Sequence, residues 1–241
     1  MKKITKVLLA IFILLIILVV IATFAHPEEQ QEIEILDNYT TILGSNSNGT
    51  VYKIVCGNNS SDDTAIVILG VHSLEGGIHN ATNESIINFT KNNELNRKYI
   101  VYFIKLNYND SGLNTSDYNT NRHMGEMLAN KFVVPDIEKY NPYLVIDIHE
   151  MESYWEYQKY VGVMDNESDL EMEYAYRIAN NLSYPILTIN AGTSPEWVTI
   201  PIEKNDHTVI LFETPQKNSQ YNKTLVARDL IKTIDTLPIY Y

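Results

Sequence analysis

The sequence is poor in cysteine and in basic residues. Cys56 is the one cysteine in 241 residues, which excludes an internal disulfide. It ends the apolar stretch 51–56, so we expect a buried thiol. Only 18 lysines and arginines stand against 30 aspartates and glutamates, and the net charge is −12. This balance disfavours polyanionic partners, and we predict that the protein binds no nucleic acid.

Internal repeats and low-complexity tracts are also missing, which excludes solenoid and fibrous architectures. The apolar share of 45% and the charged share of 20% are ordinary for a globular protein. The length predicts one domain with an appendage and is too short for two full domains.

One long hydrophobic run is present near the N-terminus. Three lysines precede the run 7–24, in which Thr23 is the one residue that is not apolar. Eighteen residues of helix span about 27 Å, enough to cross the hydrocarbon core of a bilayer. Lysines before the run and acidic residues after it place the N-terminus in the cytoplasm. We predict an uncleaved transmembrane signal anchor over 1–25; the alternative is a signal peptide cleaved after Ala25.

The chain after this anchor is expected to lie outside the cell. An acidic stalk is predicted over 26–41 and a folded domain over 42–241. Twelve Asn-x-Ser/Thr sequons occur, whereas the Asn, Ser and Thr content predicts about three by chance. Glycosyl transfer takes place on extracytoplasmic surfaces, so the excess favours a glycoprotein. An accidental clustering in an asparagine-rich chain is the alternative.

Strand-like and helix-like stretches alternate along the domain. Short runs rich in Val, Ile and Tyr predict strands at 51–56, 65–71, 99–106, 144–149, 160–164, 186–189 and 209–213. Helical periodicity predicts helices at 121–132, 171–182 and 220–236, the last with Tyr221, Leu225, Leu230 and Ile234 on one stripe. This α/β alternation indicates a mostly parallel sheet covered by helices on both faces.

Two histidines stand at the ends of predicted strands. A His-x-x-Glu spacing occurs four times and has little weight alone; the pair His123/Glu126, near a helix start, is set aside. His72 and His149 differ because each directly follows an apolar strand run, and open α/β sheets bind ligands at the carboxyl ends of their strands. A glycine-flanked turn lets His72 and Glu75 point at one spot. Two imidazoles and a carboxylate suit Zn²⁺ with an open position, although each histidine taken alone fits a structural role equally well.

Two further features complete an ordered set. Asn119 to Arg122 lie between the two histidine segments, and Glu213 ends the apolar run 209–213. The set resembles the zinc carboxypeptidase superfamily, including its succinylglutamate desuccinylase and aspartoacylase-like branch. The resemblance covers residues 65–214 and rests on four motifs that occur in the same order.

The resemblance implies a three-layer α/β/α sandwich around a mostly parallel mixed sheet. It also implies one zinc ion on His72, Glu75 and His149. Asn121 and Arg122 would hold a substrate carboxylate. Glu213 would be the general base, with Glu150 the next carboxylate to consider.

The sequence departs from the family pattern at two places. Family members have an aspartate three residues before the arginine, behind the first histidine, where this chain has Asn119. The arginine that the family directs at the oxyanion has no clear counterpart, and Arg97 and Lys105 are the nearest candidates. These departures bear on the expected substrate and catalytic rate more than on the expected metal site.

The function expected from the sequence is a membrane-anchored, extracytoplasmic, zinc-dependent amide hydrolase. It would be a carboxypeptidase or deacylase acting on peptides or N-acyl amino acids with a free carboxylate, with cell-wall peptides among the candidates. Two other classes stay open: an inactive cell-surface binding protein of the same fold, and an anchored adhesin-like glycoprotein. Zinc content separates the enzyme from both.

Overall fold

The computed structural model describes residues 39–107, 115–165 and 168–240. These residues belong to a compact unit that spans Glu34–Tyr241. The predicted signal anchor and nearly all of the predicted stalk lie outside the described residues. Among the helices that are described, none combines the length and apolarity needed to cross a membrane.

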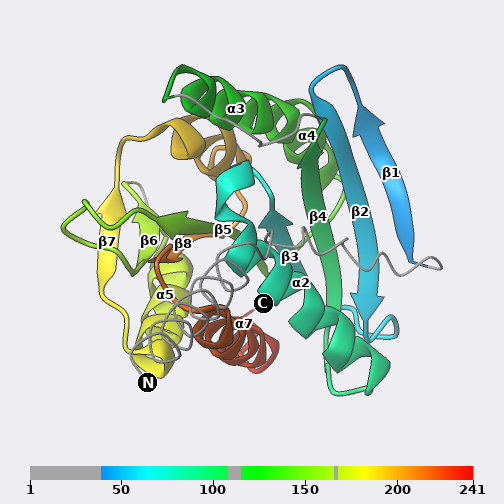
Figure 1. Ribbon diagram of the computed structural model, residues 1–241. Helices are drawn as coiled ribbons and strands as arrows, with labels where there is room; N and C mark the ends of the chain where they lie inside the picture. The colour runs from blue at the N-terminus through cyan, green and yellow to red at the C-terminus, as the bar shows by residue number, and fades with distance from the viewer. Residues whose placement is uncertain (1–38, 108–114, 166–167, 241) are drawn as a thin grey trace, which may run out of the picture. The chain divides into compact units, whose positions relative to one another are not determined.

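An eight-stranded sheet forms the centre of this unit (Figure 1). The strands follow the spatial order β1-β2-β4-β3-β5-β8-β6-β7, and four of the seven neighbouring pairs are parallel. The bounds are β1 Thr40–Ser45, β2 Gly49–Gly57, β3 Thr64–Leu69, β4 Lys98–Leu106, β5 Leu144–Met151, β6 Tyr160–Met164, β7 Ile186–Ile189 and β8 Val209–Pro215.

All seven predicted strands are present, and β1 is an addition. β1 begins at Thr40, so the last two residues of the predicted stalk are part of the sheet. Thr40 and Thr41 pair with Ile54 and Lys53 of β2 in antiparallel register. The strand forms at the sheet edge through these backbone pairings, without an apolar run of its own.

Helices pack on both faces of the sheet. On one face, α7 (Gln220–Asp235) contacts both α2 (Gly76–Lys91) and α5 (Asp169–Leu182). The elements on the other face are α3 (Thr115–Leu128), the π-helix η2 (Ala129–Val133), α4 (Val134–Ile137), the π-helix η3 (Pro195–Thr199) and α6 (Ile200–Glu203). Strand β4 shows the division, because Tyr99 reaches Ile231 of α7 whereas Tyr102 bonds Asp136 of α4. The predicted coverage of both faces is therefore confirmed.

The central strands are buried on both faces, as parallel strands in α/β proteins usually are. All six residues of β3 are buried, and the buried part of β5 runs from Leu144 to Glu150. Cys56 is fully buried as predicted, and this burial raises the pKa of its thiol to about 12. Asn83 is also buried, within α2, so this sequon is closed to glycosylation in the folded protein.

Candidate metal centre

Four of the predicted site residues, His72, Glu75, His149 and Glu213, lie at or just after the carboxyl ends of three neighbouring strands, β3, β5 and β8, whereas Asn121 and Arg122 lie on α3. After β3 the chain turns at Gly70, whose φ of 81° favours glycine and whose Cβ would lie 2.2 Å from the Ile104 carbonyl oxygen. His72 follows, and the short helix η1 (Ser73–Glu75) carries Glu75 back toward it. His149 and Glu213 are register partners on β5 and β8.

His72, Glu75 and His149 meet at one buried point. His72 Nδ1 lies 2.8 Å from Glu75 Oε1, and His149 Nδ1 lies 2.9 Å from Glu75 Oε2. The two Nδ1 atoms are 3.2 Å apart. All three residues are at most 3% exposed, and they form a group of potential metal ligands. The sequence therefore identified three residues that the fold brings together.

Each histidine is held from behind by a buried carboxylate. His72 Nε2 lies 3.0 Å from Glu126 Oε1, and His149 Nε2 lies 3.0 Å from Asp147 Oδ1. Ser194 adds a hydroxyl 3.1 Å from His149 Nε2. Sequence analysis missed these three partners. Asp147 could have been found, because it lies two residues before His149 on a strand and so shares its face.

This arrangement fits a divalent cation. When the Nε2–H of His72 is donated to Glu126 and that of His149 to the Ser194 hydroxyl, both Nδ1 atoms present bare lone pairs toward the Glu75 carboxylate. Three acceptors converging on one buried point repel each other unless a proton or a cation lies between them. Tetrahedral zinc with bonds of about 2.0–2.1 Å would separate its ligand atoms by roughly 3.3 Å, close to the distances observed.

The charges of the site are strongly coupled. Burial opposes ionisation of Glu75, but His72 and His149 outweigh it and hold the pKa of this carboxyl well below its usual range. Burial likewise opposes protonation of His149, and Asp147 and Glu75 raise its pKa well above the usual value. The site is therefore a strongly attractive environment for positive charge, whether a proton or a metal ion.

Glu213 borders this group and differs from it. Burial raises the pKa of Glu213 well above its usual range. The nearby His149 lowers this pKa, whereas the negative charges of Glu75 and Asp147 raise it further. Within the described residues, Glu213 Oε2 has no hydrogen-bond partner although it is buried. Asn121 likewise has an unpartnered buried amide nitrogen in the described part of the chain. Unpartnered polar atoms of this kind are costly and mark sites that receive a ligand or water.

Arg122 lies at the metal group. Its guanidinium NH1 is 3.0 Å from Glu75 Oε1, and its side chain is 27% exposed. Arg97, one of two residues considered for the oxyanion, is excluded by its position. It precedes β4 at the opposite end of the parallel strands and binds Asp63 and the carbonyl oxygen of Leu237. Trp197, in the π-helix η3, packs its ring against His123 with the ring centroids 5.1 Å apart.

Glu150 points to the other face of β5 from His149. Its carboxylate lies 2.7 Å from Lys223 Nζ and accepts the backbone N–H of Ile78 at 2.6 Å. Burial raises the pKa of Glu150 to about 7, against the lowering effect of Lys223. The expectation that Glu150 could replace Glu213 as the base does not hold, because strand alternation turns Glu150 away from the metal group.

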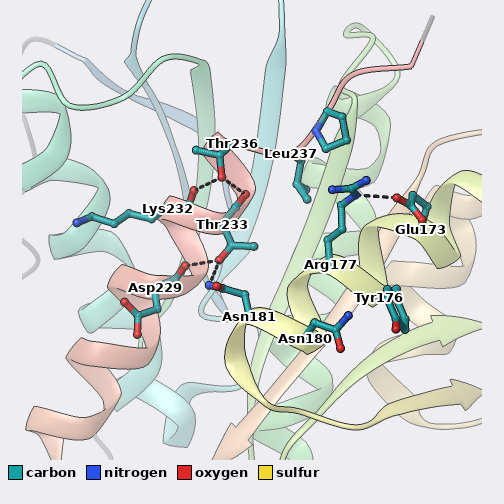
Figure 2. Close-up of a pocket in the computed structure, with 11 residues that line it drawn as sticks. Glu173, Tyr176, Arg177, Asn180, Asn181, Asp229, Lys232, Thr233, Thr236 and Leu237 are labelled. Atoms are coloured by element: carbon teal, nitrogen blue, oxygen red, sulfur yellow. Dashed lines mark hydrogen bonds and ion pairs between the residues drawn. The ribbon is translucent and has the colours of Figure 1, made fainter.

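A surface hollow elsewhere is unrelated to this chemistry. It has a volume of about 850 Å³ and lies between α5 and α7 (Figure 2). Arg177 in its wall is 2.7 Å from Glu173, and Asn181 donates to Thr233 at 2.6 Å. These four polar side chains of the hollow are thus engaged in pairs.

No protein-family model matches the sequence, and no characterised protein matches it by sequence. Comparison of the fold with solved structures gives clear matches. A metallo-carboxypeptidase of Burkholderia cenocepacia superposes with a TM-score of 0.53, at 9% identity, over 84% of this chain and 65% of the other. The fold is that of the metallo-carboxypeptidases.

A second structure of this fold is the tripeptide-bound cell shape determinant Csd4 of Helicobacter pylori. It superposes with a TM-score of 0.52 at 12% identity, over 76% of this chain and 54% of Csd4. The chain thus matches between a half and two thirds of the length of these metallo-carboxypeptidase-fold proteins. The resemblance noted in the sequence is confirmed at the level of the fold.

Proposed function

We propose that this protein is a zinc-dependent amide hydrolase, a carboxypeptidase or deacylase, that acts on peptides or N-acyl amino acids. One observation carries the proposal: three metal-ligand atoms converge at a strand-end edge beside Glu213, a buried carboxylate with an unpartnered oxygen. Metal ligands next to a general base of raised pKa are the parts needed for hydrolysis with an activated water.

His72, Glu75 and His149 would hold the ion, with Glu126 and Asp147 fixing the two imidazoles. A bound zinc ion would supply Lewis acidity toward the scissile carbonyl and toward a water molecule. Glu213 would accept a proton from that water at its unpartnered oxygen and pass it to the leaving amine. A raised pKa suits this second step, since a more basic carboxylate keeps the proton until the amine takes it.

Asn121 and Arg122 would recognise the substrate. Asn121 offers an unpartnered amide nitrogen, and the Arg122 guanidinium lies beside Glu75. A guanidinium can bind a carboxylate through two parallel hydrogen bonds, so we propose a substrate with a free carboxylate next to the cut bond. The tripeptide bound to Csd4 supports a peptide, and the role of Csd4 in cell shape supports a cell-wall peptide.

We further propose that the enzyme is anchored in the membrane by residues 7–24 and works outside the cell. The lysine asymmetry, the apolar run and the sequon excess support this topology. The acidic domain would remain in solution above the bilayer, away from anionic lipid.

A binding protein without activity is the second candidate. The observation in its favour is the location of Arg97, which leaves the oxyanion without the arginine that the resemblance calls for. Zinc content separates the enzyme from a binding protein that has lost its metal, and turnover separates it from a binding protein that retains zinc.

The test uses full-length protein with its metal content determined by elemental analysis. We expect one zinc per chain and release of a C-terminal residue or acyl group from a panel of short peptides and N-acyl amino acids. The matched control is the same panel with the free carboxylate amidated, which should lose turnover. Zinc without any turnover would favour the binding protein, and equal rates on amidated substrates would remove Arg122 from its role.

A further inference from the structure

We propose that Glu126 is a positioning residue that fixes the ring of His72 and directs its Nδ1 at the metal. The inference rests on the proposed function, since it concerns a ligand of the proposed zinc. It deepens that function by identifying the carboxylate behind the first histidine. The family resemblance places this carboxylate at position 119, where the chain has Asn119.

The contact itself is buried and direct. Glu126 Oε1 lies 3.0 Å from His72 Nε2, and the two side chains are 1% and 3% exposed. The opposite ring nitrogen, Nδ1, faces Glu75 and His149. A carboxylate that accepts the Nε2–H leaves the Nδ1 lone pair free and makes the imidazole a better donor to a metal. His149 also has a carboxylate behind it, since Asp147 Oδ1 lies 3.0 Å from its Nε2, but its hydrogen bond goes to the Ser194 hydroxyl, which in turn donates to Asp147.

One face of α3 delivers two of these contacts. Arg122 and Glu126 are four residues apart and therefore neighbours on the helix surface. Arg122 reaches Glu75, while Glu126 reaches His72. The aspartate of the resemblance would lie three residues before Arg122, whereas the carboxylate found here lies four residues after it. The charge behind the first histidine is thus supplied from a position seven residues, or about two turns, further along the same helix.

A glycine makes this approach feasible. Gly125 lies where α3 passes the segment before His72, and a Cβ there would be 1.8 Å from the carbonyl oxygen of Val71. No side chain fits at that distance, so Gly125 allows the helix to come close enough for Glu126 to reach His72. The close approach of α3 at Gly125 and the buried contact of Glu126 with His72 are two separate observations that support the same role for Glu126.

Glu126 has little reason to be buried unless it serves this purpose. Burying a carboxylate is costly without charged or hydrogen-bonding partners. Glu126 also has a hydrogen bond with the exposed Thr193 side chain, and its other oxygen lies 3.4 Å from Nδ1 of His123, whose side chain is 50% exposed. Of these partners only His72 is buried, so its 3.0 Å contact is the one that best accounts for the burial of the carboxylate.

The experiment compares zinc affinity in the full-length protein, measured by competition with a chromophoric chelator after the metal has been stripped. Glu126→Gln keeps a hydrogen-bond acceptor but loses the charge, and Glu126→Ala loses both. We expect zinc binding to weaken about tenfold to hundredfold, with alanine weaker than glutamine. The visible absorption of the cobalt-substituted variants should also change, because the ligand ring is no longer held in place.

Glu171→Gln is the matched control. Glu171 is also a buried helical glutamate, and it accepts the backbone N–H of Met164 at 3.2 Å. This variant should lower thermal stability while keeping the zinc affinity and cobalt spectrum of the parent. Glu126→Gln that binds zinc within about threefold of the parent would overturn the inference while leaving the proposed function intact. A parent protein that binds no zinc would overturn both.

Discussion

Replacing Glu213 with glutamine should make the protein more stable and far less active. Glu213 is 7% exposed, its Oε2 has no partner in the described structure, and burial raises its pKa well above the usual range. Glutamine has the same shape without the charge. An unsatisfied buried polar group costs about 1–3 kcal/mol, and more when charged. We therefore expect the free energy of unfolding at pH 8 to rise by about 1–3 kcal/mol.

The gain in the free energy of unfolding of the Glu213→Gln variant should increase with pH. A carboxyl with a raised folded-state pKa contributes stability that is fully present below its unfolded pKa of about 4.3. That contribution is lost as the pH rises through the folded-state pKa. Glutamine does not titrate, so the difference in unfolding free energy between variant and parent should be small at pH 4 and grow toward pH 8. Chemical denaturation of both metal-free proteins across this range measures it.

Turnover should move in the opposite direction. An amide has no lone pair basic enough to accept the proton of a water molecule, and loss of general-base assistance costs about 10²–10⁴ in rate. kcat should fall by roughly a hundredfold or more while zinc content and substrate affinity persist. A variant with parental stability and turnover within about threefold of the parent would refute both the burial argument and the catalytic role.

Three further predictions concern the metal ligands, the buried Glu150 and the proposed topology. His72→Ala or His149→Ala should abolish stoichiometric zinc in elemental analysis, whereas His207→Ala, outside the metal group, should not; zinc that survives in a His72/His149 double variant would exclude these ligands. Lys223→Met leaves the buried Glu150 carboxylate without its cation and should lower the free energy of unfolding by about 3–5 kcal/mol. Because the pKa of Glu150 is already raised to about 7, that loss should be larger at pH 8 than at pH 5.5, and an equal loss at both would contradict the assignment. Protease added to intact cells should remove residues after about position 26, and full protection of the domain with an accessible outer surface would reverse the proposed topology.

The sequence predicted the strands well because they are buried in a parallel sheet. Apolar runs such as 144–146 and 209–212 have no other stable location, and the polar residues near their ends then meet at one edge. That reasoning sufficed to bring His72 and His149 to one edge. Glu75 required in addition the glycine-flanked turn that contains both His72 and Glu75.

The helices were harder to predict because tertiary packing determines them. Helix α2 begins with two glycines and contains many Asn, Ser and Thr residues, which are weak helix formers. It forms because residues such as Ile78, Ile86 and Phe89 are buried against the sheet and α7. In contrast, β1 has no apolar run and depends on its pairing with β2.

The last helix shows an error in the predicted stripe. Leu230 and Ile234 are buried as predicted, but Tyr221 is 72% exposed and Leu225 is 43% exposed. Five residues separate Leu225 from Leu230, which rotates the side chain by about 140° around the helix axis. The four residues therefore cannot share one face, and the first turns of α7 present their apolar side chains to solvent.

Glu126 was missed for a different reason. The pair His123/Glu126 was visible as a His-x-x-Glu spacing, but its location near a helix start gave no information about which face of the helix would be buried. Only the close approach of α3 at Gly125 turns Glu126 inward. A glycine beside a glutamate in a helix is a weak signal by itself, and it gains meaning once the neighbouring segment is known.

The pairing of His149 with Glu213 across β5 and β8 has a consequence for engineering and for divergence. Adjacent strands keep a spacing of about 4.8 Å whatever connects them, so backbone hydrogen bonds set the distance from the proposed base to the imidazole. The segment 152–159, which leaves the sheet edge after β5, can be exchanged or lengthened without altering that distance. A chimera that receives this segment from another protein of the fold should therefore change its substrate and retain its reaction.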